Sequence, residues 1–236
     1  MALDKRITFG GDVIPAWIAS APKVVRPTRK MTIIPIAGTN RESVEMEDAW
    51  ECYEQPYTLF VGDGTENSIQ EILNDVAVKL YKKGWQVLMD DYDTDTYRLA
   101  CYRGPFDVEN RYTRAGKFEI SFHCRPERFL ISGNVEQNVL SGDKIFNPTG
   151  FNSKPFIHIT GSGDGTLTVN GTTMEFEGIG DYLNIDCDKM DVFRLPSENK
   201  NSLMTGDFPT LASGDNTVSF SGGISTVTIT PKFWTI

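Results

Sequence analysis

The clearest hydrophobic pattern in the first half of the chain is helical. Five apolar residues recur at intervals of three and four, the spacing of one helix face: Ile69, Ile72, Leu73, Val76 and Leu80. Ser68 and Glu71 have the capping-box spacing, in which each side chain satisfies a free backbone N–H, and Gly84 suits a left-handed stop. The pattern predicts a surface helix over about residues 68–83, laid on a sheet.

The patterns around this helix are those of β-strands. Apolar and polar residues alternate over 117–124, which predicts a strand with one buried face made of Phe118, Ile120, Phe122 and Cys124. The pair Arg125-Pro126 is expected to end that sheet. Shorter strands are predicted at 57–61, 85–89 and 96–102. Residues 6–36, rich in proline, are expected to form edge strands and crossing loops because proline cannot donate to a sheet ladder.

Turn residues punctuate the second half of the chain. Residues 132–153 lack apolar periodicity and are predicted to be a linker and a loop. Asn170-Gly171 predicts a two-residue hairpin turn with positive φ, and Gly163-Asp164-Gly165 predicts another turn. A closing hairpin is expected around Gly222-Gly223. Short strands are predicted at 155–160, 166–169, 174–177, 181–186, 192–195, 217–220 and 226–230.

These elements predict a mainly β (α+β) protein of two domains. The first, residues 1–131, is expected to be a β domain with one helix. A linker over 132–150 is expected to lead to a β-sandwich over 151–236. No repeat of solenoid or propeller period is visible.

Charge and composition narrow the function classes. The 236 residues carry a formal charge of -9, which argues against nucleic-acid binding or anionic membranes, since both need clustered Lys and Arg. The one basic cluster, Arg26, Arg29 and Lys30, is expected to be a solvated loop. The N-terminus has no signal-peptide pattern, and no stretch is apolar enough for a membrane helix.

Candidate catalytic and metal-binding residues are few. The two histidines, His123 and His158, sit on alternating strands and are expected to point outward, so Cys124 cannot pair with its neighbour His123 as a nucleophile. The four cysteines, Cys52, Cys101, Cys124 and Cys187, form no C-x-x-C pair and are expected to be reduced thiols without zinc. We therefore predict no catalytic residue, no cofactor and no enzymatic activity.

Two acidic clusters imitate metal sites. Asp91, Asp93 and Asp95 resemble the opening of a calcium loop, but Thr96 and Tyr102 stand where its glycine and glutamate belong. The second cluster is Asp186, Asp188 and Asp191. Both are expected to be solvated, so no metal is predicted.

Aromatic residues are the remaining candidates for binding. Side chains that could stack on sugars are Trp17, Trp50, Trp85, Tyr182, Phe208 and Trp234. Aromatic residues also dominate cores and subunit contacts, which is the more ordinary interpretation.

A family resemblance appears in the second half. The segments 146–150 (FNPTG), 153–157 (SKPFI), 161–171 (GSGDGTLTVNG) and 184–188 (NIDCD) resemble the C-terminal domain of siphophage distal tail proteins. The most specific piece is Asn199–Asn216, with Gly206-Asp207-Phe208-Pro209-Thr210-Leu211 and Gly214-Asp215-Asn216 before the final strands. The first half is similar more loosely, through Ile7–Gly11, a strand near Ile36-Ala37-Gly38, the helix, Trp85 and Phe122–Pro126.

The resemblance implies a structural role in the virion, at the tail tip or baseplate, after synthesis in the cytoplasm of a host bacterium. It implies a homohexameric ring whose N-terminal domains form a belt and whose C-terminal domains are galectin-like or carbohydrate-module-like β-sandwiches. The implied partners are the tail tube protein, the tape measure protein, a tail-associated hub protein and receptor-binding proteins. The alternative function is a carbohydrate-binding module that contacts cell-wall saccharide, and a cell-wall hydrolase is a more distant one.

Overall fold

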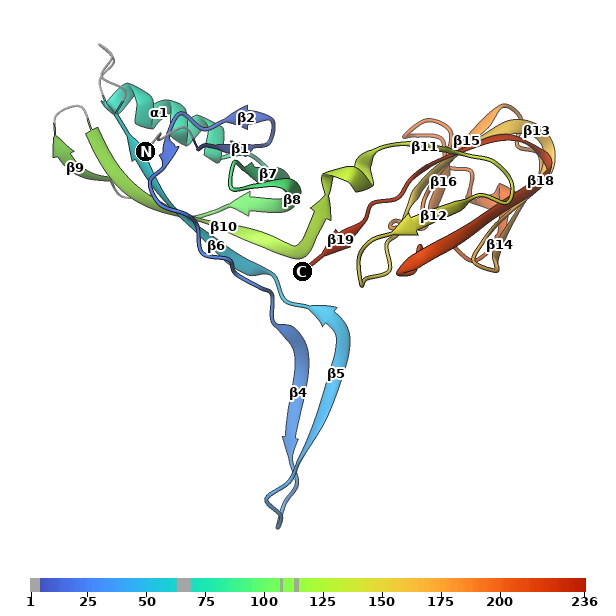
Figure 1. The fold of residues 1–236 in the computed structure, drawn as a ribbon, viewed down its shortest axis with the longest axis horizontal. Helices are drawn as coiled ribbons and strands as arrows, with labels where there is room; N and C mark the ends of the chain where they lie inside the picture. The colour runs from blue at the N-terminus through green and yellow to red at the C-terminus, as the bar shows by residue number, and fades with distance from the viewer. Residues whose placement is uncertain (1–4, 63–68, 107, 113–114) are drawn as a thin grey trace. The chain divides into compact units, whose positions relative to one another are not determined.

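The computed structural model describes residues 5–62, 69–106, 108–112 and 115–236 (Figure 1). The chain divides into two compact units, residues 1–128 with Ile236, and residues 129–235. Each unit has its own buried core. The described residues form antiparallel sheets and one α-helix, so the predicted fold class, mainly β with a helix in the first part, is confirmed.

The first unit is a twisted antiparallel sheet with a helix and a separate hairpin. The main sheet has the order β2-β1-β7-β8-β10-β6-β3, with β9 paired to β10. The strands are β1 (Ile7–Phe9), β2 (Asp12–Val13), β3 (Trp17–Ile18), β4 (Arg29–Pro35), β5 (Glu42–Trp50), β6 (Tyr53–Val61), β7 (Gln86–Asp90), β8 (Asp93–Tyr102), β9 (Val108–Tyr112) and β10 (Ala115–Leu130).

Strand β10 shows the predicted alternation, but it does not end where proline was expected to end it. Phe118, Ile120, Phe122 and Cys124 are buried, whereas the residues between them are exposed or half-buried. The strand continues through Pro126 to Leu130. Its pairing with β6 runs from Gly116 to Cys124, so Pro126 lies beyond that ladder.

The helix α1 (Ile69–Leu80) is shorter than the 68–83 that the periodicity predicts. Val76 and Leu80 are fully buried in the core of the first unit. The helix ends early because Lys82 N donates to Leu80 O, a tighter turn than a helical one, and Gly84 follows at φ +72°. Of the predicted capping box, Ser68 lies outside the described residues.

Strands β4 and β5 form a hairpin that the sequence patterns did not predict. Ile36-Ala37-Gly38, where the resemblance implied a strand, lies in the turn at its tip, and Gly38 adopts φ +77°. Arg29 and Lys30 belong to β4 and not to a loop, which corrects the expectation for the basic cluster. Both strands pair only with each other in a two-stranded sheet.

The second unit is an eight-stranded antiparallel sheet wrapped around one apolar core. Its main path is β11-β18-β13-β14-β17, with β12 on β18 and with β15 linking β13 to β16. Single 3₁₀ turns cover Ile131–Asn134 and Asn201–Leu203. The eight strands of the sheet are β11 (Gln137–Val139), β12 (Lys144–Asn147), β13 (Phe156–Val169), β14 (Thr172–Phe176), β15 (Tyr182–Asp186), β16 (Asp191–Phe193), β17 (Met204–Gly206) and β18 (Gly214–Thr230). Strand β19 (Trp234–Thr235) follows and is not part of this sheet.

The stretch expected to be a linker, 132–150, takes part in this sheet. Residues 137–139 pair with 227–229 of β18, and residues 144–147 pair with 214–217. Val139 and Ile145 are buried in the core of the second unit. The polar, turn-rich composition of this stretch did not indicate these strands, because each is only three or four residues long.

Two turns predicted from glycine are bends inside long strands. β13 runs through Gly163-Asp164-Gly165, and β18 runs through Gly222-Gly223, so no closing hairpin forms there. The two strands pair along nearly their whole length, with register shifts between Thr160 and Gly165. A Cβ added at Gly223 would lie 2.0 Å from the Ser162 carbonyl oxygen, which explains why glycine is needed at the bend.

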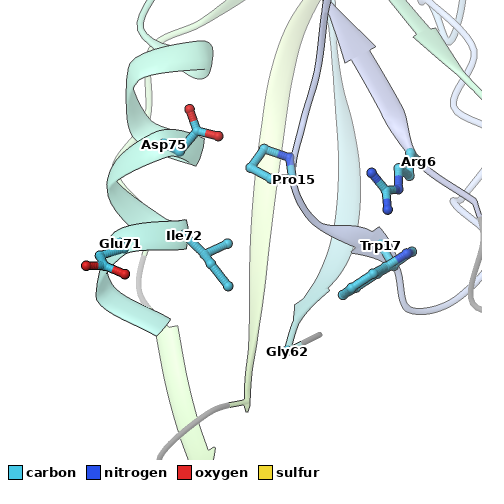
Figure 2. Close-up of a pocket in the computed structure, with 7 residues that line it drawn as sticks. All are labelled: Arg6, Pro15, Trp17, Gly62, Glu71, Ile72 and Asp75. Carbon is cyan, nitrogen blue, oxygen red and sulfur yellow. The ribbon is translucent and has the colours of Figure 1, made fainter. Parts of the chain in front are cut away.

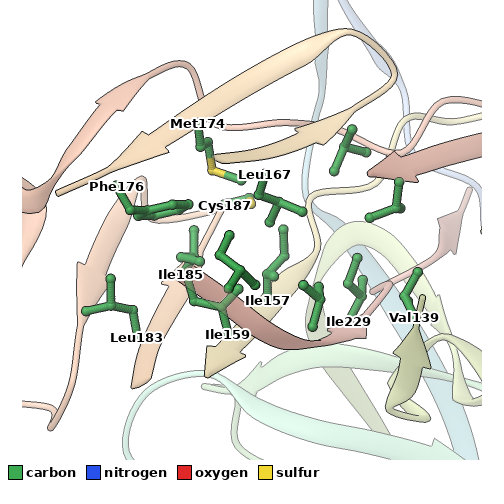
Figure 3. Close-up of a cluster of buried hydrophobic side chains, with 14 of the residues drawn as sticks. Val139, Ile157, Ile159, Leu167, Met174, Phe176, Leu183, Ile185, Cys187 and Ile229 are labelled. Carbon is green, nitrogen blue, oxygen red and sulfur yellow. The ribbon is translucent and has the colours of Figure 1, made fainter. Parts of the chain in front are cut away.

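The hairpin predicted at Asn170-Gly171 is confirmed. It joins β13 to β14, and both residues have positive φ, 51° and 83°. Side chains from β11, β13, β14, β15 and β18 converge on the core between the bent halves of the sheet, as Figure 3 shows for Val139, Ile157, Leu167, Phe176, Ile185 and Ile229.

Candidate functional site

The cysteines and histidines of the described residues form no nucleophile–base pair. Burial raises the pKa of the Cys124 thiol and of the Cys187 thiol to about 12, so both stay protonated and inert near neutral pH. His123 stands on the opposite face of β10 from Cys124. His158 Nδ1 lies 2.8 Å from Asn184 Oδ1, within the sheet face of the second unit.

The acidic clusters are held by the protein's own donors. Asp186 Oδ1 accepts from the backbone N–H groups of Asp188 and Lys189, and Lys189 also pairs with its Oδ2 at 3.0 Å. Asp91 Oδ2 accepts from the Arg6 N–H at 2.7 Å. Among the described residues no group of three or more His, Cys, Asp or Glu is arranged to hold a metal ion.

A buried ionic network, which sequence reasoning missed, lies in the core of the first unit. Asp90, 2% exposed at its side chain, accepts a 2.7 Å hydrogen bond from the Tyr57 hydroxyl and a longer one, 3.4 Å, from Arg98. Asp93 accepts from Arg98, Arg128 and Thr96. The alternation of β7, which makes Asp90 an inward residue beside Leu88, was the signal that could have revealed it.

Acid is expected to destabilise the first unit through Asp93. Burial pulls the pKa of Asp93 upward, but hydrogen bonds from Thr96 and Arg128 outweigh it and hold the pKa below the usual 3.8. A carboxyl group whose pKa is lower in the folded state than in the unfolded state stabilises the fold at pH values above its unfolded pKa. This stabilisation is lost as the pH falls through the pKa of the folded state. We therefore expect unfolding free energy to fall below about pH 4.

This pH dependence can be measured by urea unfolding followed by tryptophan fluorescence, because Trp17, Trp50 and Trp85 all lie in the first unit. Asp93→Asn is the matched variant, since it keeps the shape and removes the titrating group. Its unfolding free energy should change less between pH 5 and pH 3 than that of the unaltered protein. Equal slopes in the two proteins would contradict the assignment.

A shallow hollow of about 330 Å³ lies between α1 and the segment around β3 (Figure 2). Glu71 and Asp75 line it from the helix, while the Arg6 guanidinium stacks 5.3 Å from the centroid of the Trp17 ring on the other side. Asp75 is paired with Lys79 at 2.9 Å. The titratable side chains among its described lining residues are Arg6, Glu71 and Asp75.

The outer face of the main sheet carries an aromatic and ionic cluster. The Trp85 ring stacks on His123 with centroids 5.9 Å apart, and the Arg125 guanidinium lies 5.0 Å from the Trp85 ring. Glu54 lies 2.7 Å from Arg103 and 2.9 Å from His123 Nδ1. Burial raises the pKa of Glu54, but hydrogen bonds from Arg103, His123 and Ser121 more than compensate and lower it. This carboxylate therefore serves as an ion-pair partner.

The six aromatic residues considered for sugar stacking do not gather on one surface. Trp17 and Trp50 are engaged by Arg6 and Arg29, and Trp85 by His123. In the second unit Tyr182 contacts His158, Phe208 packs against the core, and Trp234 stacks on Phe151 with centroids 4.5 Å apart.

Among the described elements, the β4–β5 hairpin has the highest density of exposed apolar side chains. Met31 lies opposite Met46, and Ile33 lies opposite Val44. Directly opposed residues in an antiparallel pair share a face, so these four form one apolar face. The same hairpin also exposes Ile34 and, at its tip, Ile36. Within the described part of the chain no helix is long and apolar enough to cross a membrane.

Neither a protein-family model nor a curated protein matches the sequence. Solved structures do match. The Dit protein (gp 19.1) of phage SPP1, described as a paradigm of the hub adsorption apparatus in phages infecting Gram-positive bacteria, has a TM-score of 0.77 at 14% identity, covering 97% of this chain and 99% of that one. A chain of the phage P2 baseplate in its activated conformation with Ca has a TM-score of 0.52 at 11% identity, covering 95% and 97%. The chain thus has the Dit fold over nearly its whole length, which confirms the resemblance at the level of fold.

Proposed function

We propose that this protein is a structural, non-enzymatic hub subunit of a phage tail tip or baseplate. The observation that carries the proposal is the match of both units, in one chain and in the same order, to the SPP1 Dit protein. A shared fold alone does not determine function. The proposal gains support from the described residues, which combine an exposed apolar hairpin with no nucleophile–base pair.

In the proposed assembly six copies close into a ring at the end of the tail tube, with residues 1–131 forming the belt. Ring closure requires heterologous contacts, in which two different patches on each copy meet. The ring would join the tail tube protein and the tape measure protein to the tail-associated hub protein and to receptor-binding proteins. The acidic charge of -9 makes direct contact with nucleic acid an unfavourable alternative.

We expect the purified protein to form closed rings of six subunits. Light scattering at several concentrations would give the mass, and negative-stain images would show whether a central channel is present. A zymogram on bacterial cell walls should show no hydrolysis. A protein that stays monomeric at high concentration, or one that clears the cell walls, would contradict the proposal.

Saccharide binding by the second unit is not proposed as a second function. Stacking on a sugar requires an accessible aromatic face. In the second unit, the candidates Tyr182 and Trp234 are half-buried in separate ring contacts, and Phe208 is packed on the core. Phe146 is 63% exposed, but one exposed ring among the described residues of this unit gives no specific support for that function over the structural one.

A further inference from the structure

The hairpin of β4 and β5 has one apolar face that no described part of the chain covers. Ile33 is 51% exposed and Met46 is 64% exposed, and Met31 and Val44 beside them are exposed to a similar degree. The opposite face carries Thr32 across from Glu45 and Ile34 across from Ser43. This ribbon is thus amphipathic, a pattern that stabilises a strand only when its apolar face is buried.

The conformation of the hairpin is fixed by its own bonds. Arg29 pairs with Asp48 at 2.8 Å at the base, where the Glu51 N–H also donates to the Thr28 carbonyl oxygen. At the tip, the Ile36 N–H donates to the Arg41 carbonyl oxygen. A two-stranded hairpin is only marginally stable alone in water, so a preset ribbon with an apolar face is suited to packing on another surface.

A surface of complementary chemistry exists on the main sheet of the same unit. Trp85 and Val87, each 39% exposed, form an apolar ridge on its outer face, and Val87 lies opposite Leu99 of β8. Cationic groups flank the ridge, namely Arg125 stacked on Trp85 and the exposed Arg103. Methionine side chains pack well on aromatic rings, which suits Met31 and Met46 to this ridge.

The charges of the two surfaces are also complementary. Strand β5 carries four exposed carboxylates, Glu42, Glu45, Glu47 and Asp48, whereas the bases of the hairpin lie on β4 (Arg29 and Lys30) and at the tip (Arg41). The carboxylates of β5 are attracted by the arginines beside Trp85 and would be repelled by the phosphates of nucleic acid or of an anionic membrane.

We propose that the apolar face of the β4–β5 hairpin docks on the Trp85–Val87 ridge of a second copy of this chain. The hairpin face and the ridge are different patches, so the contact is heterologous and can be repeated from copy to copy until a ring closes. The inference rests on the proposed ring function and identifies the residues that make its contact.

The test uses two full-length variants that each break one side of the contact. Ile33→Glu/Val44→Glu places carboxylates on the apolar face of the hairpin, and Val87→Glu places one on the ridge. Both sites are exposed, so the fold should be retained, and circular dichroism and thermal melting would verify this. Burying an unpaired carboxylate should weaken association by at least about a hundredfold. The matched control is Ile34→Glu, on the opposite face of the same strand, which should assemble as the unaltered protein does.

Mixing the two variants makes the test specific. The hairpin variant keeps an intact ridge and the ridge variant keeps an intact hairpin, so an equimolar mixture should form dimers, and each variant alone should stay monomeric in analytical ultracentrifugation. Rings formed by the Ile33→Glu/Val44→Glu variant would overturn the inference and leave the hub function standing. If both variants are monomeric and their mixture forms no dimer, the Trp85–Val87 ridge is not the surface on which the hairpin docks. A monomeric unaltered protein would overturn both the inference and the ring.

Discussion

Replacing Asp90 by alanine is expected to destabilise the first unit by about 3 kcal/mol, the lower end of the cost of breaking a buried ion pair, because Arg98 keeps Asp93 as a second partner at 3.4 Å. The Asp90 carboxylate accepts from the Tyr57 hydroxyl, from Arg98 and from the backbone N–H groups of Tyr92 and Asp93. The Arg98 side chain is only 8% exposed, so water does not replace the lost acceptor. Urea unfolding followed by tryptophan fluorescence would measure the loss.

Two further variants separate charge from packing. Asp90→Asn keeps an acceptor oxygen in place and should cost less than Asp90→Ala. Asp90→Ala combined with Arg98→Met removes both charges, and this double variant should be more stable than the sum of the single losses predicts. Additive losses would show that the two side chains stabilise the unit independently of each other.

Replacing Gly223 by alanine is expected to destabilise the second unit by about 1–3 kcal/mol, because the added methyl group overpacks the bend and the backbone must shift to make room. The added Cβ would lie 2.0 Å from the Ser162 carbonyl oxygen and 3.0 Å from that of Asp164, and both are backbone atoms. The clash falls where β13 and β18 bend together, so relief requires the two strands to separate.

Differential scanning calorimetry with hydrogen exchange on β13 and β18 would measure this effect. The matched control is Gly150→Ala in the same unit, where an added Cβ meets nothing within 4 Å. The control should unfold at nearly the same temperature as the unaltered protein. If both variants unfold alike, the close approach at the bend is not what requires glycine.

Local patterns predicted the elements that have one buried face. The alternation of β10 and the periodicity of α1 are direct consequences of burial, because Phe122 and Val76 have to face a core. Asn170-Gly171 was predictable because a two-residue turn requires positive φ at both positions. These features depend only on residues close in sequence.

Elements that depend on distant partners were not predictable. Gly222-Gly223 has the composition of a turn, and only its pairing with residues 161–165 turns it into a bend within one strand. The β4–β5 hairpin was missed although Val44 and Met46 alternate with glutamates, because neither strand buries a face in this chain. The ion pair of Asp90 and Arg98 could not be predicted from the sequence because it depends on how the strands pack in space. In a sequence, charged residues at alternating positions usually indicate a solvated edge.

The long β13–β18 pairing has a consequence for the order in which the chain folds. Residues 156–169 pair with 218–230, so the second unit depends on contacts between segments about 60 residues apart, and such non-local pairing folds slowly. The main sheet of the first unit also pairs distant segments, but these pairs lie between residues 7 and 124, which are synthesised earlier. During synthesis the first unit can therefore fold while the ribosome is still making β18, and the edge of β13 that later pairs with β18 is the segment most exposed to aggregation in that interval.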